Sequence, residues 1–148
     1  MAFPKSLAIG AALALVSCSG GTPKIAVSGA WARATVPGQT SAAAYLQIAN
    51  TGDGADTLTA VSAEVGEATM HSSNMEAGIM RMRPLKSLDV PAHSTVRFQP
   101  GSNHIMISGL EQPLHESDSF TLALGFQRSG VQRVKVEIRP ATTSGMEM

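Results

Sequence analysis

Cysteine is almost absent from this chain. Cys18 is the only one among 148 residues, so no disulfide can form within the chain. Because Cys18 also lies close to the N-terminus, a metal site in the rest of the chain must be built without thiolate. A blue-copper centre, which needs a cysteine ligand, is therefore excluded.

Charged residues are also scarce. The formal net charge is zero and only 15% of the residues are charged, whereas an average globular chain has about 25%. The sequence therefore offers no basic face for nucleic acid and no acidic tail. We expect no nucleic-acid partner.

Long hydrophobic runs are lacking as well. The run from Leu7 to Val16 is too short to cross a bilayer as a helix, which takes about 20 residues. With Lys5 before it, the run is typical of a secretory signal peptide. The segment Leu15-Val16-Ser17-Cys18 that follows resembles the bacterial lipobox, in which cleavage occurs before the cysteine and that cysteine is lipidated.

Residues 1–18 are therefore predicted to be a signal peptide with a lipobox. The alternative is an ordinary small-residue cleavage site with an incidental cysteine. On either interpretation we expect the mature protein outside the cytoplasm, in the periplasm or cell envelope. A lipobox would attach it to a membrane through Cys18.

Three segments are predicted after the signal peptide. Residues 19–23 are expected to form a linker, residues 24–139 a single domain and residues 140–148 a flexible tail. Within the domain, short segments of alternating apolar and polar residues are separated by turn residues. The candidate strands are 25–33, 42–50, 57–65, 68–72, 79–83, 95–99, 104–108, 120–126 and 134–138. No long stretch keeps a helical period, so we predict an all-β fold, an antiparallel Greek-key β-sandwich or barrel.

Two of these segments form a predicted hairpin that carries a histidine and a methionine. The segments are joined by a glycine-containing turn after Met75. If the hairpin closes around Glu76-Ala77, His71 lies opposite Met82, with Cβ atoms about 5 Å apart. Both side chains then project from one face, as chelation of one ion requires.

A second histidine and methionine follow in a later strand. His104 and Met106 are two residues apart, so in a strand they point to the same face. Ile105 and Ile107 then point to the opposite face. The strand therefore presents a second pair of donors beside the turn that precedes it.

Imidazole and thioether donors together are suited to copper. Thioether is a soft ligand that selects Cu(I) over Zn(II), and neither group brings a negative charge. Ca(II) or Mg(II) would require carboxylates, and Glu76 is the only one in these segments. The two histidines and two methionines are therefore predicted to bind a transferable Cu(I).

The spacing of the four residues resembles that of a known family. Ten residues separate His71 from Met82, twenty-one separate Met82 from His104, and one separates His104 from Met106. The sequence is similar to the periplasmic copper chaperones called PCu(A)C in this spacing and in the surrounding segments. These segments are 29–35, 43–46, 79–84, 100–106 and 109–110.

The resemblance implies a fold, a function and partners. The fold would be a cupredoxin-like β-barrel with an exposed His/Met site for Cu(I). The protein would deliver copper toward the copper centres of cytochrome oxidase, alongside a thioredoxin-like copper chaperone. On this basis we expect a copper chaperone of the cell envelope and not an enzyme.

The remaining methionines have simpler interpretations. Met70, Met75 and Met80 are expected to be packing residues, because methionine in an alternating strand usually fills the core. Met80 shares a face with Met82 and is a candidate spare ligand, but we favour packing. Met146 and Met148 are expected to lie in the tail.

The other histidines and the single tryptophan are also expected to be structural. His93 and His115 are interpreted as surface or hydrogen-bonded residues in loops. Trp31 is expected to pack in the barrel wall, because its side chain is first a large apolar group.

Two other classes of function stay open. The protein could be a metal-free β-sandwich lipoprotein that acts as an interaction module, or a copper redox enzyme. A hydrolase is disfavoured because the sequence has no Gly-x-Ser-x-Gly motif and no other cysteine nucleophile. Measuring Cu(I) binding distinguishes the first alternative, and assaying turnover of a reductant distinguishes the second.

Overall fold

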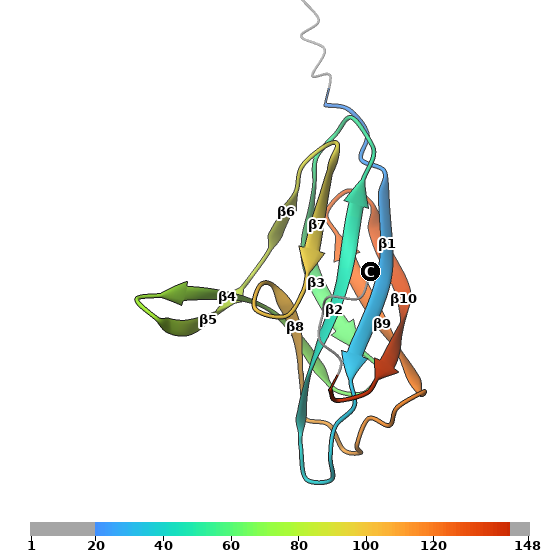
Figure 1. Ribbon diagram of the computed structural model, residues 1–148. Coiled ribbons are helices and arrows are strands. Elements are labelled where there is room, and N and C mark those ends of the chain that lie inside the picture. Colours follow the sequence, from blue (N-terminus) through green and yellow to red (C-terminus); the bar gives the residue numbers. More distant parts are fainter. Residues whose placement is uncertain (1–19, 143–148) are drawn as a thin grey trace, which may run out of the picture.

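The computed structural model describes residues 20–142, which contain ten strands and no helix (Figure 1). The predicted all-β class is confirmed. Within these residues there is no helix long and apolar enough to cross a membrane. Outside the described residues lie the predicted signal peptide with Cys18, and Met146 and Met148 of the predicted tail, which stay predictions.

The strands are β1 Ile25–Arg33, β2 Ser41–Asn50, β3 Asp56–Ala63, β4 Glu67–Glu76, β5 Ile79–Leu85, β6 Leu88–Val90, β7 Ser94–Phe98, β8 His104–Ser108, β9 Ser119–Phe126 and β10 Gly130–Arg139.

The strands follow the alternation in the sequence. In β9, Phe120, Leu122 and Leu124 are buried while the residues between them are partly exposed. This is the two-residue period of a sheet with one face on a core. β6 was not predicted, because its three residues are too few to show an alternating pattern.

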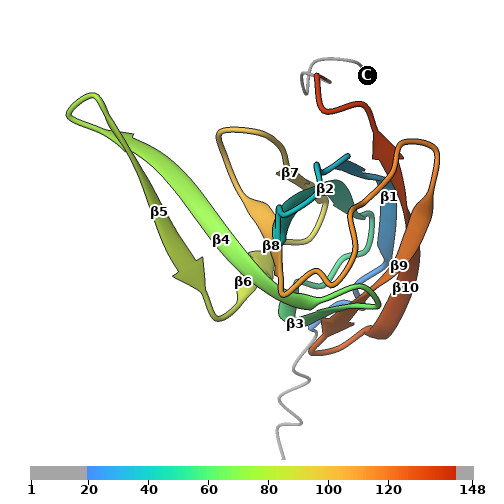
Figure 2. The ribbon, with the colours of Figure 1, turned by 90° about the horizontal axis from the view of Figure 1, so that it is seen from below.

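All ten strands belong to one curled sheet. The order is β5-β4-β8-β2-β1-β10-β9-β3-β6, and β7 also pairs with β2. Figure 2 shows β8, β2, β1, β10, β9 and β3 arranged around a common centre, where the core lies. The pairs are antiparallel as predicted, with the exception of β1 and β10, which run parallel. The sheet does not close, because its order ends at β5 and β6.

The hairpin of β4 and β5 projects away from this curled body (Figures 1 and 2). β4 pairs with β8 from Glu67 to His71 and then continues only with β5. The two strands are joined by Ala77 and Gly78, which have φ values of 51° and 79°. Positive φ at both residues is what a two-residue hairpin loop of type I′ requires.

The hairpin register therefore differs from the prediction. The loop is Ala77-Gly78 rather than Glu76-Ala77, so His71 lies opposite Pro84, and Met82 lies opposite Ser73. The prediction that His71 lies directly opposite Met82 is wrong, because Met82 lies two residues from the position opposite His71. Because the side-chain period of a strand is two, the shift leaves both side chains on one face.

A buried aspartate ties the start of β3 to the turn between β9 and β10. The Asp56 carboxylate accepts hydrogen bonds from the backbone N–H groups of Thr57, Arg128 and Ser129 and from the Ser129 hydroxyl. Burial alone would raise the pKa of Asp56, but these hydrogen bonds outweigh it and hold the pKa below its usual value.

We predict that Asp56→Asn lowers the free energy of unfolding at neutral pH by about 1–3 kcal/mol, because charged acceptors for buried N–H groups are lost. The native pKa is depressed, so this contribution is complete above the unfolded-state pKa of about 3.9 and is lost as the pH falls through the native pKa. Urea denaturation at several pH values measures it. Asp53→Asn, which changes an exposed carboxylate, is the control and should alter stability by about 0.5 kcal/mol or less. Equal stability of Asp56→Asn and wild type at neutral pH would contradict the prediction.

Candidate metal centre

Two histidine rings meet where the hairpin leaves the curled body of the sheet. His71 of β4 pairs directly with His104 of β8. Their ring centroids are 5.6 Å apart and the rings are inclined by only 18°. The sequence separates these residues widely, but the antiparallel pairing of β4 and β8 brings them together.

The core determines which way the two rings point. Met70 pairs with Ile105, and both side chains are buried in the core. Ile107 is fully buried as well. Because neighbouring residues in a strand point to opposite faces, His71 and His104 must lie on the face away from the core.

Met106 lies on the same face as the two histidines. It pairs with Thr69 of β4 and with Ala43 of β2, and it is half-buried. Its position two residues after His104 gives it the same orientation in the strand. The structure therefore brings His71, His104 and Met106 together on one face of β4 and β8.

Met82 shares this face but lies farther out, on β5. It pairs with Ser73, so it is diagonal to His71 across the hairpin. Cβ atoms in a diagonal pair are about 7–8 Å apart or somewhat less, still within reach of a long side chain. The four predicted residues thus occupy one face of three neighbouring strands, with Met82 as the exposed member.

Hydrogen bonds orient both rings. His104 Nδ1 lies 3.3 Å from the carbonyl oxygen of Ser102, so Nδ1–H donates and Nε2 keeps its lone pair. A hydrogen bond from the second ring nitrogen to a carbonyl is the usual support of a metal-binding histidine. His71 Nε2 lies 3.0 Å from the Thr69 hydroxyl.

The second nitrogen of His71 has no partner. His71 Nδ1 is buried and, within the described residues, makes no hydrogen bond. Leaving a buried polar atom unpaired costs about 1–3 kcal/mol. A ring nitrogen that has no hydrogen-bond partner and lies beside a second imidazole fits a site in which a metal ion binds that nitrogen.

The environment of His71 disfavours its protonated form. Burial lowers the pKa of His71, and the neighbouring His104 lowers it further. Histidine binds a metal ion as the neutral imidazole. The site therefore favours the protonation state that can act as a ligand.

Carboxylates do not gather at the two histidines. Between residues 20 and 142, no three His, Cys, Asp or Glu side chains are placed to hold a metal ion together. By strand alternation this face also carries the hydroxyls of Thr69, Ser73 and Ser108, and the Glu67 carboxylate four residues before His71, so the side chains next to the two histidines on it are uncharged. The donor set is therefore neutral and soft, unlike a calcium or magnesium site.

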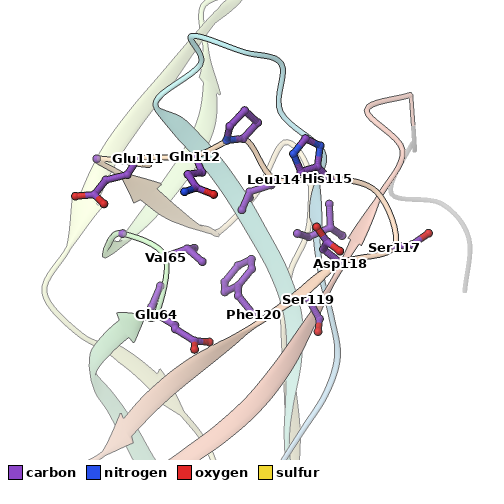
Figure 3. A pocket seen from close by; sticks show the side chains of 15 residues that line it. Glu64, Val65, Glu111, Gln112, Leu114, His115, Ser117, Asp118, Ser119 and Phe120 are labelled. Atoms are coloured by element: carbon purple, nitrogen blue, oxygen red, sulfur yellow. The ribbon is translucent and has the colours of Figure 1, made fainter.

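A separate hollow lies between residues 63–66 and the segment 109–120. Its volume is about 830 Å³, and none of the four predicted residues lines it. Figure 3 shows Glu64, Glu111 and Asp118 spaced around the hollow. In the described part of the chain, no hydrogen bond joins the His115 ring to Asp118 or to a serine hydroxyl. The hollow is therefore separate from the face that carries the two histidines.

The interpretation of the other methionines is partly wrong. Met70 is buried in the core, as predicted. Met75 and Met80 are exposed on the hairpin and fill no core. The sequence could not show this, because alternation indicates which residues share a face but not whether another element covers that face.

The structural interpretations of the tryptophan and the remaining histidines are confirmed. Trp31 is buried and packs on Tyr45, with ring centroids 4.7 Å apart. His93 is on the surface, where its Nε2 lies 2.9 Å from the Asp53 carboxylate. His115 is exposed in a loop.

The sequence matches the family described as "Putative lipoprotein LpqE-like" over residues 25–138. This chain belongs to the LpqE-like family. It is also 32% identical over 117 residues to "Putative lipoprotein Lxx21020" of Leifsonia xyli subsp. xyli (strain CTCB07), an alignment that covers 78% of this chain and 69% of that protein.

Solved structures share the fold of this LpqE-like chain. The apo PCuAC domain of PmoF2 has a TM-score of 0.68 at 19% identity, covering 82% of this chain and 94% of that domain. The copper-bound PCuAC domain of PmoF2 has a TM-score of 0.67 at 21% identity, with coverages of 79% and 93%. CuI-DR1885 from Deinococcus radiodurans has a TM-score of 0.59 at 24% identity, with coverages of 79% and 78%. The predicted resemblance to PCu(A)C proteins is thus confirmed in the fold.

We predict that, without metal, His71 becomes protonated only at a pH below the ordinary histidine value of about 6.5. Burial and the adjacent ring of His104 both disfavour the charged form. Two-dimensional NMR of the imidazole nitrogens against pH measures this directly. In His104→Ala the pKa of His71 should rise toward the ordinary value, and a His71 that titrates at or above 6.5 in the wild type would refute the prediction.

Proposed function

We propose that this LpqE-like protein is a copper chaperone of the cell envelope, which binds Cu(I) through His71, Met82, His104 and Met106 and delivers it to a partner protein. The observation that carries the proposal is the direct pairing of His71 with His104. The thioethers of Met106 on β8 and Met82 on β5 lie on the same face as the two rings.

The chemistry of the donors supports Cu(I) as the ion. Two neutral imidazoles and two thioethers leave a bound Cu(I) with its single positive charge and provide the soft ligands that this ion prefers. Two of the proteins that share the fold are described as copper-bound or CuI forms. The absence of a second cysteine also protects such a site from mixed disulfides in an oxidising compartment.

The position of the site supports transfer rather than storage. His104 is buried, whereas Met82 is exposed on the projecting hairpin. A partner that approaches the hairpin can replace Met82 first and then the deeper donors, one at a time. Such an exchange requires side-chain movement only, because the strands carrying the donors stay paired.

The recipient belongs to the same proposal. The resemblance to PCu(A)C proteins favours the copper centres of cytochrome oxidase, or a thioredoxin-like copper chaperone that serves them. We propose a carrier that turns over no substrate. A metal-free interaction module would bind no copper, and a copper redox enzyme would consume a reductant catalytically.

The family description supports the proposed location. The matching family and the relative from Leifsonia xyli are both described as lipoproteins. We propose that the mature chain begins at Cys18 and is anchored to the membrane by its lipid, in the periplasm or cell envelope. The anchor would hold the copper site close to a membrane-bound recipient.

Copper binding is tested by competition between the protein and a chromophoric Cu(I) chelator under reducing conditions. We predict one tight equivalent for the wild type. His104→Ala and Met106→Leu should weaken it by at least about 10–100-fold, the loss that residues supporting a metal ligand already cause.

The controls for this titration are His93→Ala and His115→Ala, which remove imidazoles on the surface away from the site. Both should bind Cu(I) like the wild type. If the wild type fails to compete, or if the surface variants weaken binding as much as His104→Ala, the proposed site is wrong.

Lipidation is tested by mass spectrometry of the protein purified from the membranes of an envelope-forming bacterial host. We predict that the mature N-terminus is Cys18 with covalently attached acyl chains, and that Cys18→Ala abolishes this modification. A mature chain that begins at another residue and carries no lipid would exclude the anchor while leaving the copper site untested by this measurement.

A further inference from the structure

The projecting hairpin carries an unusual surface. Among the described residues, most of the large apolar side chains that are at least half exposed lie on β4 and β5, and three of them are methionines. Met75 is 64% exposed, Met80 51% and Met82 50%. These side chains have no core to fill, so packing does not explain them.

The hairpin register places all three thioethers on one face. Met75 lies directly opposite Met80, which brings their Cβ atoms to about 4.5–5.5 Å. Met82 lies two residues beyond Met80 on the same strand and so projects from the same face. That face is also the one on which His71 lies.

The opposite face of the hairpin has a different chemistry. Glu76 forms ion pairs with Arg81 at 3.2 Å and with Arg83 at 3.0 Å. By alternation these three side chains lie away from the methionines. The only carboxylate of the hairpin tip is thus engaged with arginines, and the thioether face presents sulfur without competing charge.

We propose that Met75, Met80 and Met82 form a second site for a soft monovalent ion, outside the His/Met centre. This outer site takes Cu(I) at the exposed end of the hairpin and shares Met82 with the inner donors. An ion that moves inward exchanges Met75 and Met80 for the imidazoles of His71 and His104 while Met82 remains a common ligand. The inference rests on the proposed function only in naming Cu(I) and the inner position.

The sharing of Met82 gives the two sites a defined relation. When the inner site is filled and Met82 is committed to it, Met75 and Met80 remain as a two-sulfur site for a second ion. Because this second ion has fewer donors and no imidazole, we expect it to bind more weakly. The outer site is therefore suited to capture and release, and the inner site to retention.

The alternative is that the hairpin is an apolar docking surface for a protein. The two interpretations differ in what the sulfur does. Met→Leu conserves the apolar volume and removes the thioether. A docking surface would tolerate this change, whereas a metal site would not.

The experiment is a titration of the full chain, labelled with ¹³C in the methionine methyl groups, with Ag(I). Ag(I) is a soft monovalent ion that stands in for Cu(I) without being oxidised. We expect the first equivalent to shift the methyl signals of Met82 and Met106, and the second to shift those of Met75 and Met80. The signal of Met70, which is buried in the core, should stay in place and serves as the internal control.

Variants separate this inference from the proposed function. Met75→Leu/Met80→Leu should bind one Ag(I) instead of two, not counting any ion bound by Met146 and Met148. The first equivalent should bind as in the wild type. His71→Ala/His104→Ala should lose the tight equivalent but still shift Met75, Met80 and Met82. If Met82 and Met106 respond while Met75 and Met80 do not, the outer site is overturned and the inner site stands. If Met75 and Met80 respond without Met106, the outer site stands and the proposed function fails.

Discussion

The pairing of β4 with β8 is the constraint on which the candidate site depends. Met70 and Ile105 face each other in the core, and burying both fixes the register of the two strands. Since a slip of one residue would turn the whole apolar set outward, the hydrophobic effect also fixes what lies on the other face. His71 and His104 meet there because their neighbours are buried.

The same strands therefore combine the core on one face with the candidate donors on the other. β4 is long enough to pair with β8 near its start and then to leave the curled body with β5 (Figure 1). His71 lies at the point of departure, so the donors run from a buried ring, His104, to an exposed thioether, Met82. A rigid base and an accessible end are what a carrier needs if it is to hold a soft ion and still exchange it with a partner.

Much of this arrangement could be predicted from the sequence, because alternation reports the face of each residue. The alternation placed Ile105 and Met106 on opposite faces of one strand, as they are found. The hairpin register was wrong because alanine rarely adopts positive φ, so nothing marked Ala77 as the first loop residue. The exposure of Met75 could not be predicted, because it depends on β4 leaving the curled body of the sheet. The pairing of β4 with β8 joins segments too far apart in the chain for local patterns to reveal.

The proposed site requires that imidazole nitrogen and thioether sulfur bind one ion together at the root of the hairpin. X-ray absorption spectroscopy of the protein loaded with one equivalent of Cu(I) measures the neighbours of the metal directly. We expect nitrogen and sulfur together in the first coordination shell, with the nitrogen contribution lost in His71→Ala/His104→Ala. A shell of nitrogen and oxygen alone, or of sulfur alone, at one equivalent would contradict it.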